Sequence, residues 1–190
     1  MIKYDRWFPT VIGYSNYEKH KEIKKIFLDI DLEYKGIGFS KFEVHKDERF
    51  KDLNLWINDC VRYYAMDHQF SKWKTYEAKE SWVIDMKKNT YSDLHAHPGY
   101  TISCVYYAIT NEDDAGTIFK SPVGPDMKNP LNIKVGDAHK SHYMEFTYPQ
   151  CVYRPVQGNL LIFRSYNKHS TDYKTIDDRR VIFSYNFDPC

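Results

Sequence analysis

The sequence predicts a mainly β fold with flanking helices (α+β), a β-sandwich or barrel with helices against one face. Two amphipathic segments with helical spacing lie in the first 80 residues, and short β-branched and aromatic runs follow from residue 81. Aromatic residues make up 17% of the chain, and such side chains suit pleated sheets and enclosed pockets. With 190 residues the chain fits a single domain, 1–190, with helical support over 1–80 and a β core over 81–190.

The helices are predicted from apolar residues that recur every three or four positions. Residues 18–30 present isoleucine and phenylalanine on one face and lysine on the other. Residues 52–70 repeat the pattern with Leu53, Ile57 and Val61. We therefore expect both helices to pack on a core, with a loop or short strand between them.

Short strands are expected in the remainder of the chain, separated by turn residues. The predicted strands are 82–86, 101–109, 116–119, 151–154, 159–163 and 180–187. The connection 111–149 contains three glycines and four prolines. A long connection of this kind often covers a functional site.

Charge and cysteine content restrict the function classes. The chain has 27 Lys and Arg against 26 Asp and Glu, a formal net charge of +1, which argues against nucleic-acid binding by phosphate neutralisation. Its start has no long apolar run, so we expect neither a signal peptide nor a membrane span. The cysteines form no CxxC pair, which is typical of reduced thiols in a cytoplasmic protein. They are Cys60, Cys104, Cys151 and Cys190.

Three histidines are candidate metal ligands. His95 and His97 occupy positions i and i+2, which point to the same face of an extended backbone and can converge on one ion. His169 follows the glycine-led strand 159–163, whose end can supply a ligand from elsewhere in the fold. Taken singly, each histidine is equally compatible with a surface or loop position.

The last predicted strand separates two kinds of side chain. One face, which is mostly polar, carries Arg180, Ile182, Ser184 and Asn186, and the other is wholly aromatic or aliphatic. An arginine on a cavity-facing strand is suited to a bidentate, charge-assisted pair with a carboxylate. The alternative is an exposed edge strand with a solvated Arg180.

Several short segments match one enzyme family in order along nearly the whole chain. They are Trp7-Phe8-Pro9-Thr10, Ser81-Trp82, His95-Ala96-His97-Pro98, Ser103-Cys104-Val105-Tyr106-Tyr107, the set Gly158, Leu160, Phe163, Ser165 and His169, and the closing Arg180-Val181-Ile182-Phe183-Ser184-Tyr185-Asn186. With these segments the chain resembles the iron(II)- and 2-oxoglutarate-dependent oxygenases of the prolyl-hydroxylase-like superfamily. The resemblance is closest to a branch common in marine bacteria and their phages.

This resemblance implies a double-stranded β-helix, or jelly roll, that binds iron(II) and 2-oxoglutarate. Such an enzyme uses O2 to hydroxylate a substrate, here a small molecule or a protein side chain, and releases succinate and CO2 in a bacterial or phage-infected cytoplasm. His95 matches the first histidine of the family's His-x-Asp/Glu turn, His169 the distal histidine, and Arg180 the residue that binds the C5 carboxylate of 2-oxoglutarate. Ser184 and Tyr106 are the other expected cosubstrate contacts.

Two positions depart from the usual family pattern. His97 stands where the turn normally has Asp or Glu, so the third ligand is His97, a water or chloride, Asp93 or Asp137. We rank His97 first because the family branch that this chain resembles has both histidines in its His-x-His-Pro turn. Ile182 replaces a serine that commonly follows the arginine by two positions, which removes one hydroxyl contact to the cosubstrate.

Four tyrosines are candidates to line the pocket, and a tyrosine hydroxyl can hydrogen-bond 2-oxoglutarate. They are Tyr91, Tyr100, Tyr106 and Tyr107. Two other functions also fit the sequence. Three histidines with an open position suit a zinc-dependent hydrolase, and a non-catalytic jelly roll would use its aromatics to hold a sugar or a partner chain.

Overall fold

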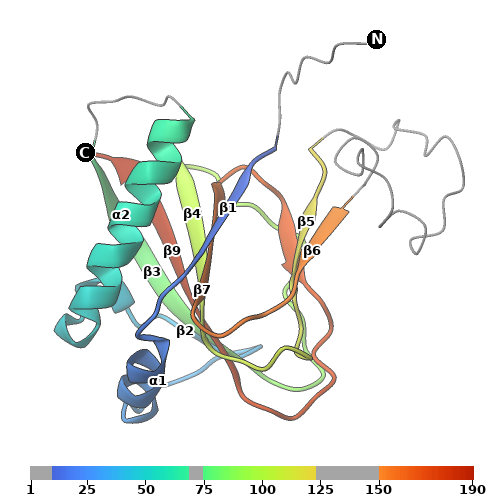
Figure 1. Cartoon of the computed structure of the whole chain (residues 1–190). Helices are drawn as coiled ribbons and strands as arrows, with labels where there is room; N and C mark the ends of the chain where they lie inside the picture. Colours follow the sequence, from blue (N-terminus) through green and yellow to red (C-terminus); the bar gives the residue numbers. More distant parts are fainter. Residues whose placement is uncertain (1–9, 69–74, 123–149) are drawn as a thin grey trace, which may run out of the picture.

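The computed structural model describes residues 10–68, 75–122 and 150–190, and these form two antiparallel sheets (Figure 1). The larger sheet has the strand order β1-β7-β4-β9-β3-β2, and the smaller has the order β6-β5-β8. The strands of the larger sheet are β1 Ile12–Asn16, β2 Phe39–Ser40, β3 Tyr76–Met86, β4 Ile102–Ile109, β7 Asn159–Arg164 and β9 Arg180–Pro189. Those of the smaller sheet are β5 Thr117–Lys120, β6 Gln150–Tyr153 and β8 His169–Thr171.

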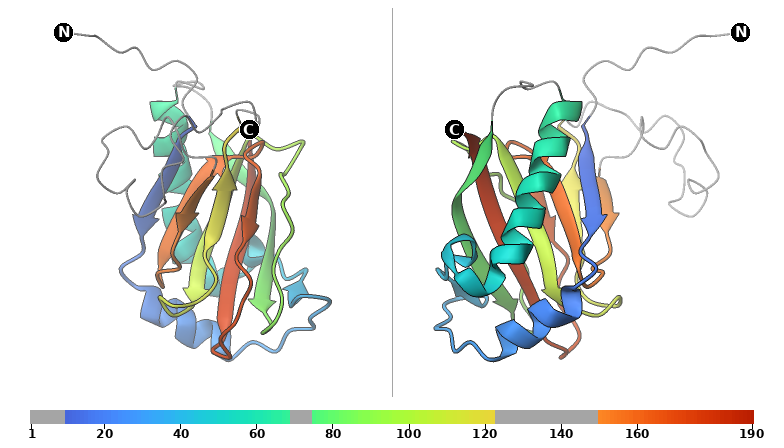
Figure 2. Two further views of the ribbon diagram at one scale, coloured as in Figure 1. Left: turned by 90° about the vertical axis from the view of Figure 1, so that its right-hand side faces the viewer. Right: turned by 60° about the vertical axis from the view of Figure 1, so that its left-hand side comes forward.

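Two helices cover one face of the larger sheet, and the smaller sheet lies on its other side (Figures 1 and 2). They are α1, His20–Leu28, and α2, Lys51–Asp67. Two 3₁₀ turns, Val44–Lys46 and Glu48–Phe50, lead into α2. The two helices predicted from apolar spacing are therefore confirmed, and each ends two or three residues earlier than expected. Among the described residues, no helix has the length and apolar character needed to cross a membrane.

The main core lies between the helices and the larger sheet. Phe183 of β9 is fully buried there, with its ring centroid 5.3 Å from those of Phe27 in α1 and Phe50 before α2. Burial of such aromatic side chains stabilises the sheet–helix contact by roughly 2–3 kcal/mol each. The apolar face predicted for this strand is thus the face that the helices cover.

A second apolar cluster fills the space between the two sheets. It consists of Val105, Tyr107, Phe119, Leu161, Phe163 and Ile182. Both faces of β9 are consequently enclosed, one by the core under the helices and one by this cluster. Both edges of β9 are paired as well, with β4 and with β3. The alternative of an exposed edge strand with a solvated Arg180 is wrong: Arg180 is 0% exposed.

Three features of the sheets were not predicted. Strands β1 and β8 are short and polar, and each is held by pairing with a distant strand, β7 and β5 respectively. Strand β3 starts at Tyr76 rather than at residue 82. Its first residues were not predicted as a strand because they include charged, exposed side chains such as Glu77 and Lys79. Asp137 and the segment Trp7-Phe8-Pro9 lie outside the described residues.

The start of β7 depends on Gly158. Its φ of +87° lies in the left-handed region, and a Cβ there would sit 2.7 Å from the Cβ of His20. Its N–H donates to the carbonyl of Tyr107, and its own carbonyl accepts from the N–H of Tyr17. Glycine at this position therefore lets the chain enter β7 between α1 and β4.

Candidate metal centre

The backbone brings His95 and His169 together across the space between the sheets. The His95 N–H donates to the His169 carbonyl (2.9 Å), and the His169 N–H donates back to the His95 carbonyl (2.8 Å). Their ring centroids are 4.3 Å apart. A histidine from the turn before β4 thus lies beside the first residue of β8, although 74 positions separate them in the chain.

His97 joins this pair from the same turn. Its N–H donates to the carbonyl of Ser165, just beyond β7 (2.8 Å), and its ring lies 5.2 Å from that of His95 and 5.1 Å from that of His169. One ligand atom from each of the three histidines lies within 4.8 Å of the others, close enough to hold one metal ion. The structure therefore brings together all three predicted metal-binding histidines.

Hydrogen bonds at Nδ1 orient the rings of His95 and His169. Nδ1 of His95 lies 2.7 Å from the carbonyl oxygen of Asp93, and Nδ1 of His169 lies 3.0 Å from that of Asn167. A carbonyl oxygen only accepts, so each Nδ1 carries the proton and leaves the Nε2 lone pair free. This arrangement is typical of histidines that bind a metal through Nε2.

Burial keeps the enclosed rings neutral. It lowers the pKa of His169 to about 3, with further lowering by the neighbouring His95 and His97. It also lowers the pKa of His97, against the opposing effect of a hydrogen bond from that ring to Asn186. Neutral imidazole is the form that binds metal, so no proton competes for these rings near pH 7.

Arg180 lies farther along the same space, at the start of β9. Its Nε donates to the carbonyl of Ala115 (2.8 Å), and its guanidinium lies over the Tyr107 ring, 5.6 Å from the centroid. Its Nη2 is buried and, among the described residues, has no hydrogen-bond partner. Burial lowers the pKa of Arg180, but a guanidinium stays charged in proteins. An unpaired buried donor on a cation is suited to an incoming carboxylate.

Apolar side chains connect the histidines with Arg180. The Phe163 ring lies 4.8 Å from that of His169, and it belongs to the same cluster as Ile182 and Tyr107. Ser184 is 3% exposed and lies on the same face of β9 as Arg180, as the alternation predicts. Ile182 also faces this space, so the expected loss of a hydroxyl contact there agrees with its position.

The structure does not bring Tyr106 to this space. Its side chain belongs to the core under the helices, 5.9 Å from the Phe183 ring. Adjacent residues of a strand face opposite ways, so Tyr107 points between the sheets instead, where its hydroxyl bonds Thr117 Oγ1 (2.6 Å). Tyr107, and not the predicted Tyr106, therefore faces the space that contains the histidines and Arg180.

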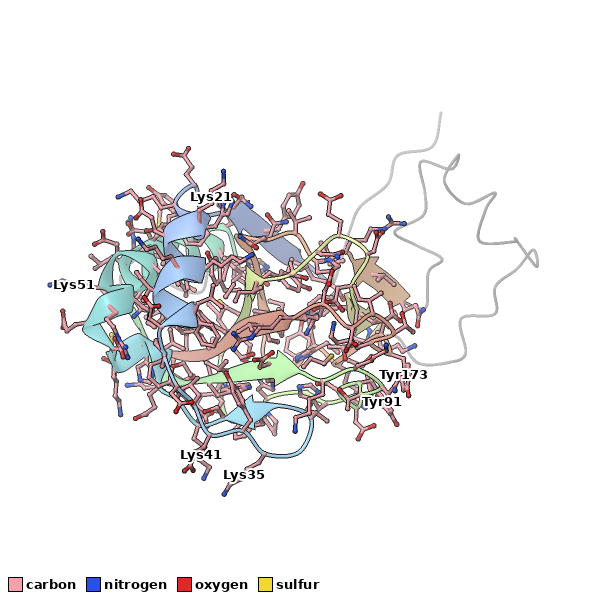
Figure 3. All side chains as sticks on the ribbon, turned by 90° about the horizontal axis from the view of Figure 1, so that it is seen from below. Lys21, Lys35, Lys41, Lys51, Tyr91 and Tyr173 are labelled. Carbon is pink, nitrogen blue, oxygen red and sulfur yellow. The ribbon has the colours of Figure 1, made fainter. Side chains whose placement is uncertain are left out.

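Other sequence candidates lie apart from the three histidines. Tyr91 is 50% exposed and packs with Tyr173 at the molecular surface, with centroids 6.2 Å apart (Figure 3). Asp93 contributes its backbone carbonyl to His95, and its carboxylate is not part of the metal-binding group found among the described residues. No pattern in the sequence predicts the buried ion pair of Lys174 and Asp114, which lies beside Ala115.

The fold and these residues define a class of protein: a two-sheet β protein with three clustered histidines and a buried arginine between its sheets. A family model described as "Putative 2OG-Fe(II) oxygenase" matches residues 80–186, more than half of the chain, including all three histidines and Arg180. The chain belongs to this family of 2-oxoglutarate- and iron(II)-dependent oxygenases. Its enzyme class and its cofactors, iron(II) and 2-oxoglutarate, are those expected from the sequence. No curated protein matches the chain.

Solved structures with the same fold cover nearly all of the chain. A 2OG-Fe(II) oxygenase family oxidoreductase from Burkholderia pseudomallei aligns with a TM-score of 0.61 at 15% identity, over 93% of this chain and 84% of that one. HygX from Streptomyces hygroscopicus with nickel and 2-oxoglutarate bound gives 0.62 at 12% identity, over 95% and 83%. A Pseudomonas putida prolyl-4-hydroxylase gives 0.58 at 11% identity, over 93% and 92%. These likenesses confirm the double-stranded β-helix fold.

Proposed function

We propose that His95, His97 and His169 hold iron(II) through their Nε2 atoms. We further propose that Arg180 binds the distal carboxylate of 2-oxoglutarate. The observation that carries this assignment is the pairing of two features in one enclosed space. Three histidine ligand atoms lie within 4.8 Å of one another, and a buried guanidinium keeps one donor unpaired.

The protein residues have distinct tasks in this scheme. Iron(II) and 2-oxoglutarate, when bound, supply the O2-dependent oxidation that releases succinate and CO2 and hydroxylates the substrate. The histidines fix the metal, and Arg180 fixes the cosubstrate by a charge-assisted pair. Tyr107 and Ser184 line the space between them, and the apolar wall around Phe163 keeps water away from the bound carboxylate.

The third histidine gives the site an unusual charge. A facial triad of two histidines and one carboxylate cancels one unit of the iron(II) charge, whereas three neutral imidazoles cancel none. With His97 as ligand the metal keeps its full double charge, and a dianionic cosubstrate is attracted to both the metal and Arg180. We assign His97 the ligand role ahead of Asp93 because the His97 ring belongs to the cluster of three histidines, whereas the Asp93 carboxylate does not.

The substrate is proposed by class only: a small molecule or a protein side chain. The near-zero net charge does not favour nucleic acid. We place the protein in a cytoplasm, that of a bacterial or phage-infected cell, on the resemblance and on its four free cysteines. We treat residues 1–190 as one oxygenase domain.

A zinc hydrolase could use the same histidines, but it would have no use for Arg180. Such an enzyme needs a metal-bound hydroxide and a substrate-polarising group, and no dicarboxylate anchor. A non-catalytic binding protein would likewise need neither the fixed Nε2 lone pairs nor the buried cation. The buried Nη2 of Arg180, which has no hydrogen-bond partner among the described residues, therefore favours the oxygenase.

The test is an anaerobic titration of the metal-free protein with iron(II) and 2-oxoglutarate. We expect a weak visible charge-transfer band that needs both additions, and succinate formation once O2 is admitted. His95→Ala combined with His169→Ala should abolish both signals, whereas Tyr91→Phe, a surface control, should leave them unchanged. Stoichiometric zinc binding with no band and no succinate would refute the proposal.

A further inference from the structure

A chain of buried polar groups stands behind His97. Nδ1 of His97 lies 2.7 Å from Oδ1 of Asn186 and 3.0 Å from Oγ of Ser103. Ser103 Oγ also donates to Asn186 Oδ1 (2.7 Å) and contacts Ser165 Oγ (2.8 Å). Asn186, Ser103 and Ser165 are each at most 2% exposed, so the groups around Nδ1 are enclosed by protein.

The other end of the Asn186 amide reaches Glu80 on β3. Asn186 Nδ2 donates to Glu80 Oε2 over 3.1 Å. Glu80 itself is at the surface, so its carboxylate is an exposed acceptor at the edge of the sheet. The amide thus spans the distance from a surface carboxylate to an enclosed imidazole.

These contacts have only one consistent direction. The NH2 group of the Asn186 amide donates to the Glu80 carboxylate, which supplies the acceptor oxygen. The amide oxygen must then face His97, and two donors, His97 Nδ1–H and Ser103 Oγ–H, point at it. His97 is therefore held as the Nδ1–H tautomer, which leaves its lone pair on Nε2.

Resting on the proposed function, we propose that Asn186, oriented by Glu80, is the positioning residue that makes His97 a metal ligand. His97 occupies the place of a carboxylate, which can bind metal in any orientation of its two oxygens, whereas an imidazole binds through one nitrogen only. A histidine there needs its tautomer and ring direction fixed. His95 and His169 obtain this from backbone carbonyls, and His97 obtains it from a side chain 89 positions away in the chain.

If Asn186 acts as a hydrogen-bond acceptor, an apolar replacement should weaken metal binding, whereas a replacement that keeps an acceptor oxygen should not. Asn186→Leu removes the amide acceptor and leaves the Ser103 hydroxyl, which can accept from Nδ1 or donate to it, so both tautomers of His97 become accessible. Asn186→Asp combined with Glu80→Gln exchanges the two groups. The carboxylate at position 186 then accepts from His97, and the amide at position 80 donates to that carboxylate. The double variant should therefore restore what the single leucine variant loses.

The experiment is a Co(II) titration of the full chain, followed by visible absorption and proton NMR. Loss of an outer partner of a metal-bound histidine weakens metal affinity by about 10–100-fold, and we expect this for Asn186→Leu. In the Co(II) protein each coordinated histidine with a protonated Nδ1 gives one strongly shifted, solvent-exchangeable proton signal. The wild type should give such a signal for each of the three histidines, Asn186→Leu should lose the His97 signal, and the exchanged double variant should regain it.

Controls separate this inference from a general loss of structure. Asn54→Leu removes the acceptor of the Tyr185 hydroxyl (3.0 Å) on the helix side of the sheet, and should lower stability without changing Co(II) binding. Should Asn186→Leu not fold, Glu80→Ala at the surface carries the test, with a smaller loss of affinity and a weaker His97 signal expected.

The outcomes distinguish the two levels of the account. Failure of the wild type to bind Co(II) would overturn the metal site itself. Wild-type binding with unchanged affinity and an unchanged His97 signal in Asn186→Leu, or in Glu80→Ala where that variant carries the test, would overturn only the role of Asn186. A double variant as weak as Asn186→Leu would show that the residue acts by packing and not by hydrogen bonding.

Discussion

Replacing Lys174 by methionine should strongly destabilise the fold. Lys174 Nζ donates to both carboxylate oxygens of Asp114, over 3.0 and 2.8 Å, and the two side chains are 1% and 0% exposed. Methionine fills a similar volume but leaves the Asp114 carboxylate buried without its partner. Breaking a buried pair in this way costs about 3–5 kcal/mol, a large part of the roughly 5–15 kcal/mol by which domains are stable.

The disturbed hydrogen bonds should extend from Asp114 to Arg180, the proposed binding residue for 2-oxoglutarate. Asp114 Oδ1 accepts from the N–H of Ala115, whose carbonyl accepts from Arg180 Nε. Urea unfolding followed by circular dichroism measures the free energy directly, and Tm should fall by roughly 6–20 °C for a chain of this size. A change below about 1 kcal/mol would refute the reasoning.

Two controls make the result specific to burial. Lys88→Met breaks an ion pair with Asp177 at 3.7 Å, where the side chains are 44% and 85% exposed, and should cost at most about 1 kcal/mol. Lys174→Met combined with Asp114→Leu removes both charges and should be much less harmful than Lys174→Met alone, because no unpaired charge remains.

Three further predictions concern the site. Arg180→Met should raise the Kd of the nickel-loaded protein for 2-oxoglutarate at least about 30-fold, measured by calorimetry, since a buried charged pair is worth about 2–5 kcal/mol on truncation; an unchanged Kd would mean that another residue is the anchor. Tyr107→Phe should weaken the same binding and Tyr106→Phe should not, and the reverse pattern would contradict the inward placement of Tyr107. In the metal-free protein the pKa of His169 is about 3 against an ordinary 6.5, so the unfolded chain takes up more protons as pH falls through this window. The unfolding free energy should therefore drop by about 2 kcal/mol between pH 7 and 5, and His169→Gln should remove most of this drop.

Much of the metal site could be predicted because its geometry is local. An extended backbone places His95 and His97 on one face, and that rule holds in any fold. The face of β9 that carries Arg180 was also predictable, because its polar and apolar residues alternate. The ends of α1 and α2 followed from apolar spacing to within a few residues.

Other parts of the site could not be predicted, because β4 is buried on both of its faces. Every residue of β4 is buried, so its sequence carries no alternation to show that Tyr107, and not Tyr106, faces the space between the sheets. Contacts between residues far apart in the sequence also leave no pattern from which they could be predicted. Lys174 and Asp114 are 60 positions apart, and Asn186 and Glu80 are 106 positions apart. Such contacts depend on which strands become neighbours, which only the folded chain decides.

The most direct test of the central claim is a crystal structure of the Co(II) and 2-oxoglutarate complex. We expect Nε2 of His95, His97 and His169 as the protein ligands of the metal, with the distal carboxylate of 2-oxoglutarate on Nη2 of Arg180. A carboxylate or water in place of His97, or a cosubstrate carboxylate bound away from Arg180, would contradict the account.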